Sequence, residues 1–269
     1  MSRAASFRTI LCALALSLVL FSGCASRRQR QEEAKILDAE VLYKKGIAEI
    51  SRGNFRKARI FLDRIQYTPE NRTNLEPRVR LALADVAFYT GDDVSLIDAR
   101  SKYVDFVTLY GDHSRAPYAQ LQAGVCSLKQ VSHPMRDQNQ TIVAMQDLRE
   151  VERRYPGSPL VPAAGYLLRK AEGNLAEHDY QVGRFYFKRK AYLAATDRFR
   201  SVLDRYPRYT GRERVYFYLG QALLRMNNDA EGRIYLDKLV NDYPDSEYVE
   251  EARRLLSNVN SSEKASRKG

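Results

Sequence analysis

The sequence predicts an all-α protein, an α-solenoid of about five helical hairpins. Three observations lead to this fold class. Small residues, a large apolar residue and a proline recur at fixed offsets along the chain. The apolar residues between them follow helical spacing over segments of about 12–20 residues. Glycine and proline are confined to the ends and turns of these segments, where helices start and stop.

The repeat is clearest in the C-terminal half of the chain. Two sets of residues lie 37 positions apart and share offsets of 12, 16 and 24: Gly183, Ala195, Phe199 and Pro207, then Gly220, Gly232, Leu236 and Pro244. Small residues let two helices approach closely, the large residue fills the seam between them, and proline ends the second helix. This pattern, in units of about 34 residues, is typical of the tetratricopeptide repeat.

Three earlier units follow the same pattern with more variation. Their marker residues are Gly46, Ala58 and Leu62, with Tyr67-Thr68-Pro69 as the stop; Ala84, Gly91, Ala99 and Tyr103; and Gly124, Ala144, Leu148 and Tyr155-Pro156. The predicted units of the array, 37–256, are residues 37–70, 76–112, 115–156, 162–207 and 211–256. Residues 162–190 are predicted to form one long helix that links the third and fourth units.

The N-terminus has the features of an export signal. A cationic start is followed by an apolar run of about a dozen residues, which is signal-peptide length. The run ends in Ser22-Gly23-Cys24, which resembles a bacterial lipobox, so we predict a signal at 1–23 and lipid on Cys24. An uncleaved anchor or an ordinary signal peptide is the alternative. Residues 24–36 are predicted to be a flexible tether, and residues 257–269, rich in Ser, Asn and Lys, a disordered tail.

Composition argues against several classes of function. The net charge is +11, and loss of residues 1–23 with their two arginines leaves +9, but acids and bases interleave along the chain. Neither a basic stripe nor a nucleic-acid module is present. The cysteines and histidines have no metal-ligand spacing, no catalytic or phosphate-binding motif occurs, and no cofactor is expected. The repeats leave no room for a catalytic domain of about 100 residues. Cys126 is expected to be a small core residue.

Several motifs resemble the BamD family, the tetratricopeptide lipoproteins of the outer-membrane β-barrel assembly machinery. They are Arg136-Asp137-Gln138, Thr141, Ala144 and Tyr155-Pro156, Leu175 to His178, and Val182 to Tyr186 with Ala194-Ala195, Arg198-Phe199 and Tyr206-Pro207. The resemblance implies a non-catalytic protein of five repeats at the periplasmic face of the outer membrane. Its implied partners are the POTRA domains of the barrel subunit, other assembly lipoproteins and unfolded barrel proteins. A tetratricopeptide lipoprotein scaffold for peptidoglycan remodelling or for pilus or competence assembly is the alternative.

The first helix of each hairpin is expected to line a groove that binds extended peptides. Repeat register and sequence neighbours assign to this groove Tyr43, Ile47, Arg78, Phe88, Tyr89 and Tyr118. Aromatic and apolar groups with an arginine suit a peptide with bulky side chains. For any single position, a role in packing remains the alternative.

Arg198 is the predicted partner contact. It precedes the seam residue Phe199 by one position, which places its side chain at the edge of the hairpin. The resemblance implies that this arginine meets the POTRA domain nearest the barrel. The alternative is a pair within the chain, for which the candidate acids are Asp197, Asp204 and Glu213.

Overall fold

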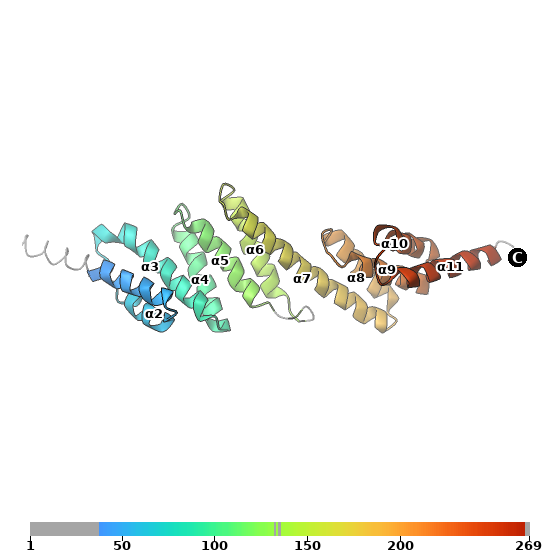
Figure 1. Ribbon diagram of the computed structural model, residues 1–269, viewed down its shortest axis with the longest axis horizontal. Coiled ribbons are helices and arrows are strands. Elements are labelled where there is room, and N and C mark those ends of the chain that lie inside the picture. Colours follow the sequence, from blue (N-terminus) through green and yellow to red (C-terminus); the bar gives the residue numbers. More distant parts are fainter. Residues whose placement is uncertain (1–37, 132, 134–135, 267–269) are drawn as a thin grey trace, which may run out of the picture. The chain divides into compact units, whose positions relative to one another are not determined.

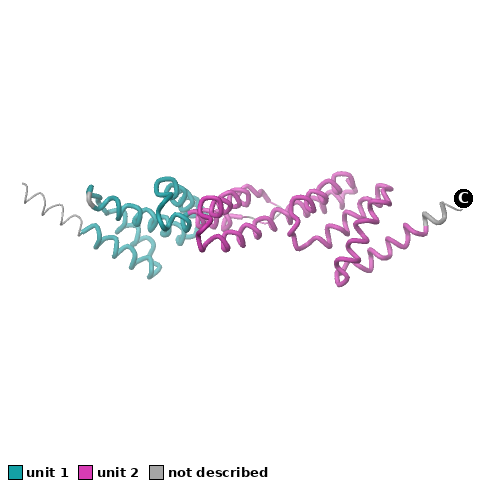
Figure 2. Tube along the Cα trace, turned by 90° about the horizontal axis from the view of Figure 1, so that it is seen from above, with its two compact units in different colours: residues 1–119 teal, residues 120–269 magenta. Residues whose placement is uncertain are grey.

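The computed structural model describes residues 38–131, 133 and 136–266. Two compact units divide the chain at residues 119 and 120, and Figure 2 colours them separately. The described residues contain five helix pairs followed by one further helix, and they contain no strand. Figure 1 shows the helices in chain order. The all-α fold of tetratricopeptide-like hairpins predicted from the sequence is therefore confirmed.

Unit 1 contains the first two helix pairs. Residues 38–51 pair with α2 (Phe55–Asp63), α3 (Pro69–Thr90) pairs with α4 (Asp93–Leu109), and the unit ends in the first residues of α5 (Ala116–Lys129). A Cβ added to Gly46 would lie 2.8 Å from the Leu62 side chain. This close approach explains why a small residue faces a large one in the repeat pattern. The core between these helices contains Leu62, Leu75, Val79 and Val86.

The predicted boundary between the first two units is wrong. Pro69 was expected to stop the first unit, with the second unit starting at residue 76, but α3 begins at Pro69. The Thr68 hydroxyl accepts a hydrogen bond from the Asn71 backbone N–H, and the Asn71 side chain accepts one from the Thr68 backbone N–H. Proline is favoured in the first turn of a helix because the missing N–H has no partner there. The same residue type can therefore start a helix as well as follow one.

Unit 2 contains the remainder of α5 and six further helices. They are α6 (Asn139–Arg154), α7 (Val161–Lys188), α8 (Tyr192–Arg205), α9 (Arg212–Arg225), α10 (Asp229–Asp242) and α11 (Val249–Ser266). The long helix expected over 162–190 is α7, visible in Figure 1. Each predicted Tyr-Pro stop directly follows a helix: Tyr155, Tyr206 and Tyr243 are the C-terminal caps of α6, α8 and α10.

Seams within unit 2 repeat the packing of unit 1. An added Cβ would lie 2.8 Å from Leu148 at Gly124, 2.6 Å from Phe199 at Gly183 and 2.7 Å from Leu236 at Gly220. The turns of the two C-terminal hairpins have the same backbone conformation at one position, because Lys190 and Asn227 both have positive φ, at 61° and 59°. These residues lie as far apart as the sequence repeat itself, which indicates that the repeat extends to the backbone conformation.

The predicted disordered tail is wrong for most of its length. Helix α11 continues to Ser266 and includes residues 257–266. Val259 is buried, so at least one apolar side chain beyond residue 256 has a packing role. Composition suggested disorder because the segment is rich in Ser, Asn and Lys, and the packing of Val259 could not be predicted from composition.

Candidate functional site

Helix α3 positions three of the six predicted groove residues of unit 1. Its start is fixed by the Thr68 cap, and it ends at Gly91, whose φ of 80° is left-handed. Asp85 lies seven residues after Arg78 on this helix, and Phe88 and Tyr89 lie three and four residues after Asp85. Side chains at such spacings share one side of a helix. The length of α3 therefore presents a row of polar and aromatic groups to the neighbouring helices.

Arg78 connects α3 to the first helix of the unit. Its Nη1 donates a hydrogen bond to Glu40 Oε1 at 2.9 Å, and its guanidinium carbon lies 4.3 Å from the centre of the Tyr43 ring. A guanidinium over a tyrosine face is attracted by the ring quadrupole. Tyr43 is half-buried, and Ile47, one turn further along the same helix, is exposed. The structure thus brings Tyr43 and Arg78 together.

A continuous series of ring contacts joins the other predicted groove residues. Tyr89 stacks on Phe55 with centroids 5.7 Å apart and meets Phe88 edge-on at 5.3 Å. Phe88 contacts Tyr103, which in turn contacts Tyr118 at 6.2 Å. Tyr103 is fully buried, whereas Tyr89 is 51% exposed. The series therefore connects the core of unit 1 to its surface, and stacking on Phe55 orients the exposed Tyr89 ring.

Asp85 is the polar centre of this aromatic cluster. The hydroxyls of Tyr103 and Tyr118 both donate to Asp85 Oδ1, at 2.6 and 2.9 Å. Burial raises the pKa of Asp85, although the two hydroxyls and the charge of Arg115 oppose the shift. Burial and the nearby Asp85 carboxylate raise the pKa of Tyr118 as well. The Arg115 guanidinium lies 4.5 Å from the centre of the Tyr118 ring. Tyr118 is therefore held by three interactions.

Two members of this aromatic cluster were not predicted. Phe55 opens α2, the second helix of its pair, while the prediction considered only first helices. Tyr103 was assigned to a seam, and its hydroxyl was not given a partner. A buried tyrosine hydroxyl needs a hydrogen bond, so an acid on the facing helix was the available signal. Beside Phe55 and Tyr89 lies a cavity of about 600 Å³ that Arg56, Lys57 and Arg59 also line.

Arg198 forms a pair within the chain, but with none of the three acids proposed from the sequence. Its Nη1 lies 3.7 Å from Asp179 Oδ1, and Arg205 approaches the other oxygen of the same carboxylate at 3.4 Å. Asp179 belongs to α7, and its side chain is only 9% exposed, while that of Arg198 is 47% exposed. The arginine therefore covers a buried acid on one side and faces solvent on the other.

The predictions about the two cysteines, membrane crossing and metal binding concern single features of the chain. Cys24 lies outside the described residues. Cys126 is fully buried in α5, as expected for a core residue. Among the described helices, none combines the length and the apolarity that a bilayer crossing requires. The described residues also contain no cluster of three metal-ligating side chains.

The sequence is similar to a known family of outer-membrane lipoproteins. Residues 36–234 match the family model YfiO, described as outer membrane lipoprotein. Outer membrane protein assembly factor BamD of Caulobacter vibrioides is 26% identical over 88% of this chain and 76% of its own length. Its counterpart from Rickettsia prowazekii is 23% identical over 93% of this chain and 97% of its own. A putative outer membrane protein assembly factor BamD of Aquifex aeolicus is 27% identical over 94% of this chain and 79% of its own length.

A solved structure, the TPR2AB-domain:pHSP90-complex of yeast Sti1, covers 84% of this chain and 84% of its own, with 14% identity and a TM-score of 0.43. The family model spans most of the sequence, including the motifs from Arg136 to Pro207 that carried the resemblance. The chain therefore belongs to the YfiO/BamD family of outer-membrane lipoproteins.

Proposed function

We propose that this chain is a non-catalytic, lipid-anchored assembly factor for outer-membrane β-barrel proteins, held at the periplasmic face by Cys24. In this role it binds unfolded barrel segments on unit 1, and it binds the POTRA domains of the barrel-assembly subunit through Arg198 on unit 2. Other assembly lipoproteins are further partners. The proposal is supported by the family match and by relatives whose names describe outer-membrane protein assembly.

The observation that carries the peptide-binding part is the aromatic series that includes the exposed Tyr89 ring. Stacking on Phe55 orients this ring before any ligand arrives, which lowers the entropy cost of binding. Tyr43 is held beneath Arg78 in the same unit. Rigid tyrosines beside arginine are the side chains that most often dominate binding surfaces. Bulky side chains of an extended barrel segment would contact these rings, and the arginine would interact with its carboxylates or carbonyls.

The double substitution Tyr43→Ala with Tyr89→Ala tests this surface. We expect the variant to keep its helical circular-dichroism signal and to bind a peptide copied from a barrel's last strand at least about tenfold more weakly. This follows if each ring contributes about 1 kcal/mol or more. Titration of the labelled peptide by fluorescence anisotropy measures the affinity. Leu193→Ala changes an exposed apolar residue of unit 2 that lines neither cavity, and this control should bind normally. Unchanged affinity in the folded double variant would remove unit 1 as the binding surface.

A further inference from the structure

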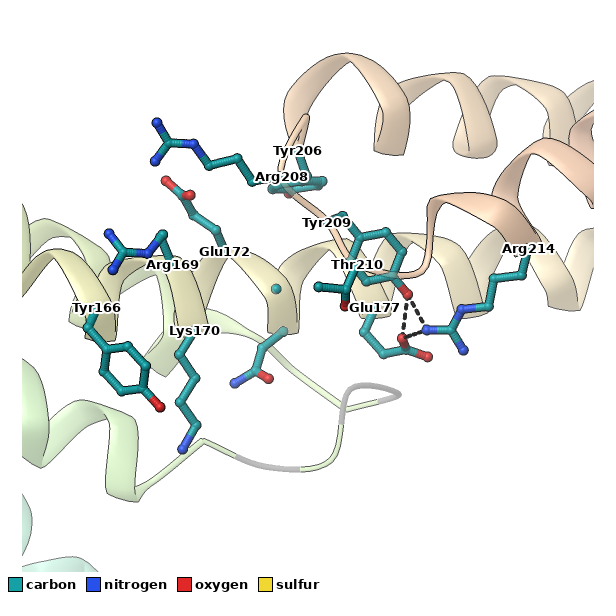
Figure 3. A pocket seen from close by; sticks show the side chains of 12 residues that line it. Tyr166, Arg169, Lys170, Glu172, Glu177, Tyr206, Arg208, Tyr209, Thr210 and Arg214 are labelled. Carbon is teal, nitrogen blue, oxygen red and sulfur yellow. Dashed lines mark hydrogen bonds and ion pairs between the residues drawn. The ribbon is translucent and has the colours of Figure 1, made fainter. Parts of the chain in front are cut away.

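A second cavity, entirely within unit 2, has a different chemistry. It has a volume of about 520 Å³ and lies between the N-terminal half of α7, the α8–α9 loop and the start of α9. Figure 3 shows its lining, with Arg169 and Lys170 from α7, Arg208 from the loop and Arg214 from α9. Four cations line the cavity and only two acids, Glu172 and Glu177. Its walls therefore favour an anionic ligand.

Contacts within the chain neutralise one end of this cavity. Glu177 forms an ion pair with Arg214 and accepts a hydrogen bond from the Tyr209 hydroxyl at 2.5 Å, as Figure 3 shows. Burial raises the pKa of Glu177, but hydrogen bonds from Tyr209 and Gln181 together with Arg214 outweigh it, and the net shift is downward. The carboxylate is thus ionised and already paired. Arg214 is committed to it and to Tyr209, and so supports the wall without adding free charge.

The remaining cations are paired with no acid in the part of the chain that the structure describes. Among the residues that the structure describes, no ion pair involves Arg169, Lys170 or Arg208, whereas Glu172 approaches Arg149 at 3.7 Å. In the view of Figure 3, Arg208 lies above α7 and Lys170 extends below it, so positive charge flanks the cavity on two sides. All three side chains are exposed and can move to a ligand.

Gly173 provides an independent observation, because it lies in the interior of α7 where glycine weakens a helix relative to alanine. An added Cβ would meet nothing within 4 Å. Packing therefore does not require a glycine here, in contrast to Gly183 on the same helix, where Phe199 fills the space. A glycine facing open space leaves room for another backbone to approach closely. Gly173 lines the cavity, and in the sequence it lies three residues after Lys170 and four after Arg169.

We propose that this cavity binds an extended, acidic polypeptide segment of a partner protein. The main chain of the segment crosses Gly173, and its carboxylates reach Arg169 and Arg208 on one side and Lys170 on the other. Successive side chains of an extended chain point to opposite sides, so neighbouring acids fit cations placed on both flanks. Planar guanidinium groups hold carboxylates through paired hydrogen bonds. The exposed ring of Tyr166 offers an apolar contact next to the acids.

The probe is a capped nonapeptide with three consecutive acids between two tyrosines, compared with the same peptide carrying Asn and Gln in place of the acids. Isothermal calorimetry with the full mature chain should show binding of the acidic peptide only. We expect Arg169→Gln with Arg208→Gln to weaken it more than tenfold and Lys170→Gln to weaken it several-fold. Gly173→Leu, which adds a bulky side chain to the lining, should also weaken binding more than tenfold. Affinity should fall as salt rises, because the contacts are between charges.

Matched controls separate this site from general charge and from unit 1. Arg153→Gln removes an exposed arginine of α6 outside the cavity and should leave affinity unchanged. Tyr43→Ala with Tyr89→Ala should also bind the acidic peptide normally, so failure of the barrel-peptide proposal and failure of this one are distinguishable. Circular dichroism must show wild-type helicity in each variant; Lys170→Gln, on the exposed surface, serves if Gly173→Leu does not fold.

Three outcomes would overturn the proposal. The first is equal binding of the acidic and neutral peptides, and the second is wild-type affinity in the folded Arg169→Gln, Arg208→Gln variant. The third concerns lipid. If vesicles containing anionic phospholipid bind through these same cations while the acidic peptide does not bind at all, the cavity recognises a lipid phosphate and not a polypeptide.

Discussion

Arg198 shows how one side chain can have two roles. Asp179 is a nearly buried acid that two arginines approach from α8, and this arrangement compensates its desolvation. Because two cations share the acid, removing one leaves the other in place. The remaining exposed face of Arg198 can still form a paired hydrogen bond with a partner carboxylate, a geometry that lysine does not reproduce.

We therefore expect Arg198→Ala and Arg198→Lys to melt close to the wild-type temperature. A partly exposed pair contributes only about 0–1 kcal/mol to stability, whereas truncating one side of a buried interface pair costs about 2–5 kcal/mol of binding. Both variants should bind the POTRA domains more weakly in calorimetry, and alanine should weaken binding more than tenfold. Arg205→Ala disrupts the other contact to Asp179 and is the control. If both Arg198 variants bind as tightly as wild type, the partner contact lies elsewhere.

Asp85 shows the opposite balance from Glu177. Both acids accept hydrogen bonds from tyrosines, but Glu177 also pairs with Arg214, while the cation near Asp85 acts through Coulomb attraction alone. Desolvation therefore dominates at Asp85 and raises its pKa, whereas the partners of Glu177 lower the pKa of that group. The difference makes Asp85 a source of pH-dependent stability in unit 1.

The expected direction follows from proton binding. The folded chain holds the Asp85 proton more tightly than the unfolded chain, so the contribution of Asp85 is fully present below its unfolded pKa of about 3.9 and is lost as pH rises through the folded value. The unfolding free energy of wild type minus that of Asp85→Asn should fall as pH increases from about 4. Urea denaturation of both proteins, followed by circular dichroism at each pH, measures this difference.

Tyr118→Phe provides an internal check on this pH dependence. It removes one hydrogen bond that favours the Asp85 carboxylate, so the fall in stability with rising pH should become steeper. A difference between wild type and Asp85→Asn that grows with pH would contradict the assignment of desolvation as the dominant cause.

At the scale of the element, two of the three glycines of α7 have contrasting surroundings. Gly183 faces Phe199 across the seam with α8, while Gly173 faces open space. The first glycine is required by close helix packing, and the second is not. Both glycines lie within one continuous helix, so the higher helix propensity of alanine should stabilise the fold at either position. If the two alanine substitutions change the unfolding free energy in opposite directions, the surroundings of the two sites are the cause.

Alanine substitution should therefore change stability in opposite directions at the two sites. Gly173→Ala should raise the unfolding free energy by up to about 1 kcal/mol, the usual helix-propensity gain. Gly183→Ala should lower it by about 1–3 kcal/mol, because its Cβ would come within 2.6 Å of the Phe199 ring. Thermal and urea denaturation of the two variants measure both effects. Destabilisation by Gly173→Ala, or a neutral Gly183→Ala, would show that the packing at these positions differs from that described.

At the scale of the whole molecule, the two compact units carry different surfaces. Unit 1 contains the aromatic series around Tyr89, and unit 2 contains Arg198 and the basic cavity that Gly173 lines. A chain with separate surfaces for separate polypeptides suits a protein that brings partners together. The proposed lipid on Cys24 would add a membrane location, because two or more acyl chains hold a protein stably where one does so only marginally.

The lipid anchor is tested by Cys24→Ser. Wild-type protein should incorporate a fatty-acid analogue during metabolic labelling and sediment with the outer membrane. The variant should take up no label and should either stay uncleaved by the lipoprotein peptidase or become soluble if another peptidase acts. Cys12→Ser, within the predicted signal, is the control and should still be labelled. Absence of label in the wild type would show that Cys24 is not acylated.

Sequence alone determined the fold class, because a tetratricopeptide seam is a local contact. Gly183 and Phe199 meet across one hairpin, and helical geometry converts their fixed spacing into packing. The same locality made the Tyr-Pro stops predictable. Pro69 was the exception, since proline is compatible both with the first turn of a helix and with the residues after one. The Thr68 cap decides between them, and it was visible in the sequence.

The sites depended on contacts that local spacing does not encode. Asp179 lies opposite Arg198 only because α7 and α8 pack with a particular rotation, so acids nearer in sequence were chosen wrongly. Asp85 receives hydroxyls from two other helices, and the basic cavity combines α7 with a loop about 30 residues away. Tertiary structure alone decides these contacts, because each requires side chains from separate elements to face one another at close range. Periodicity within one element cannot specify this.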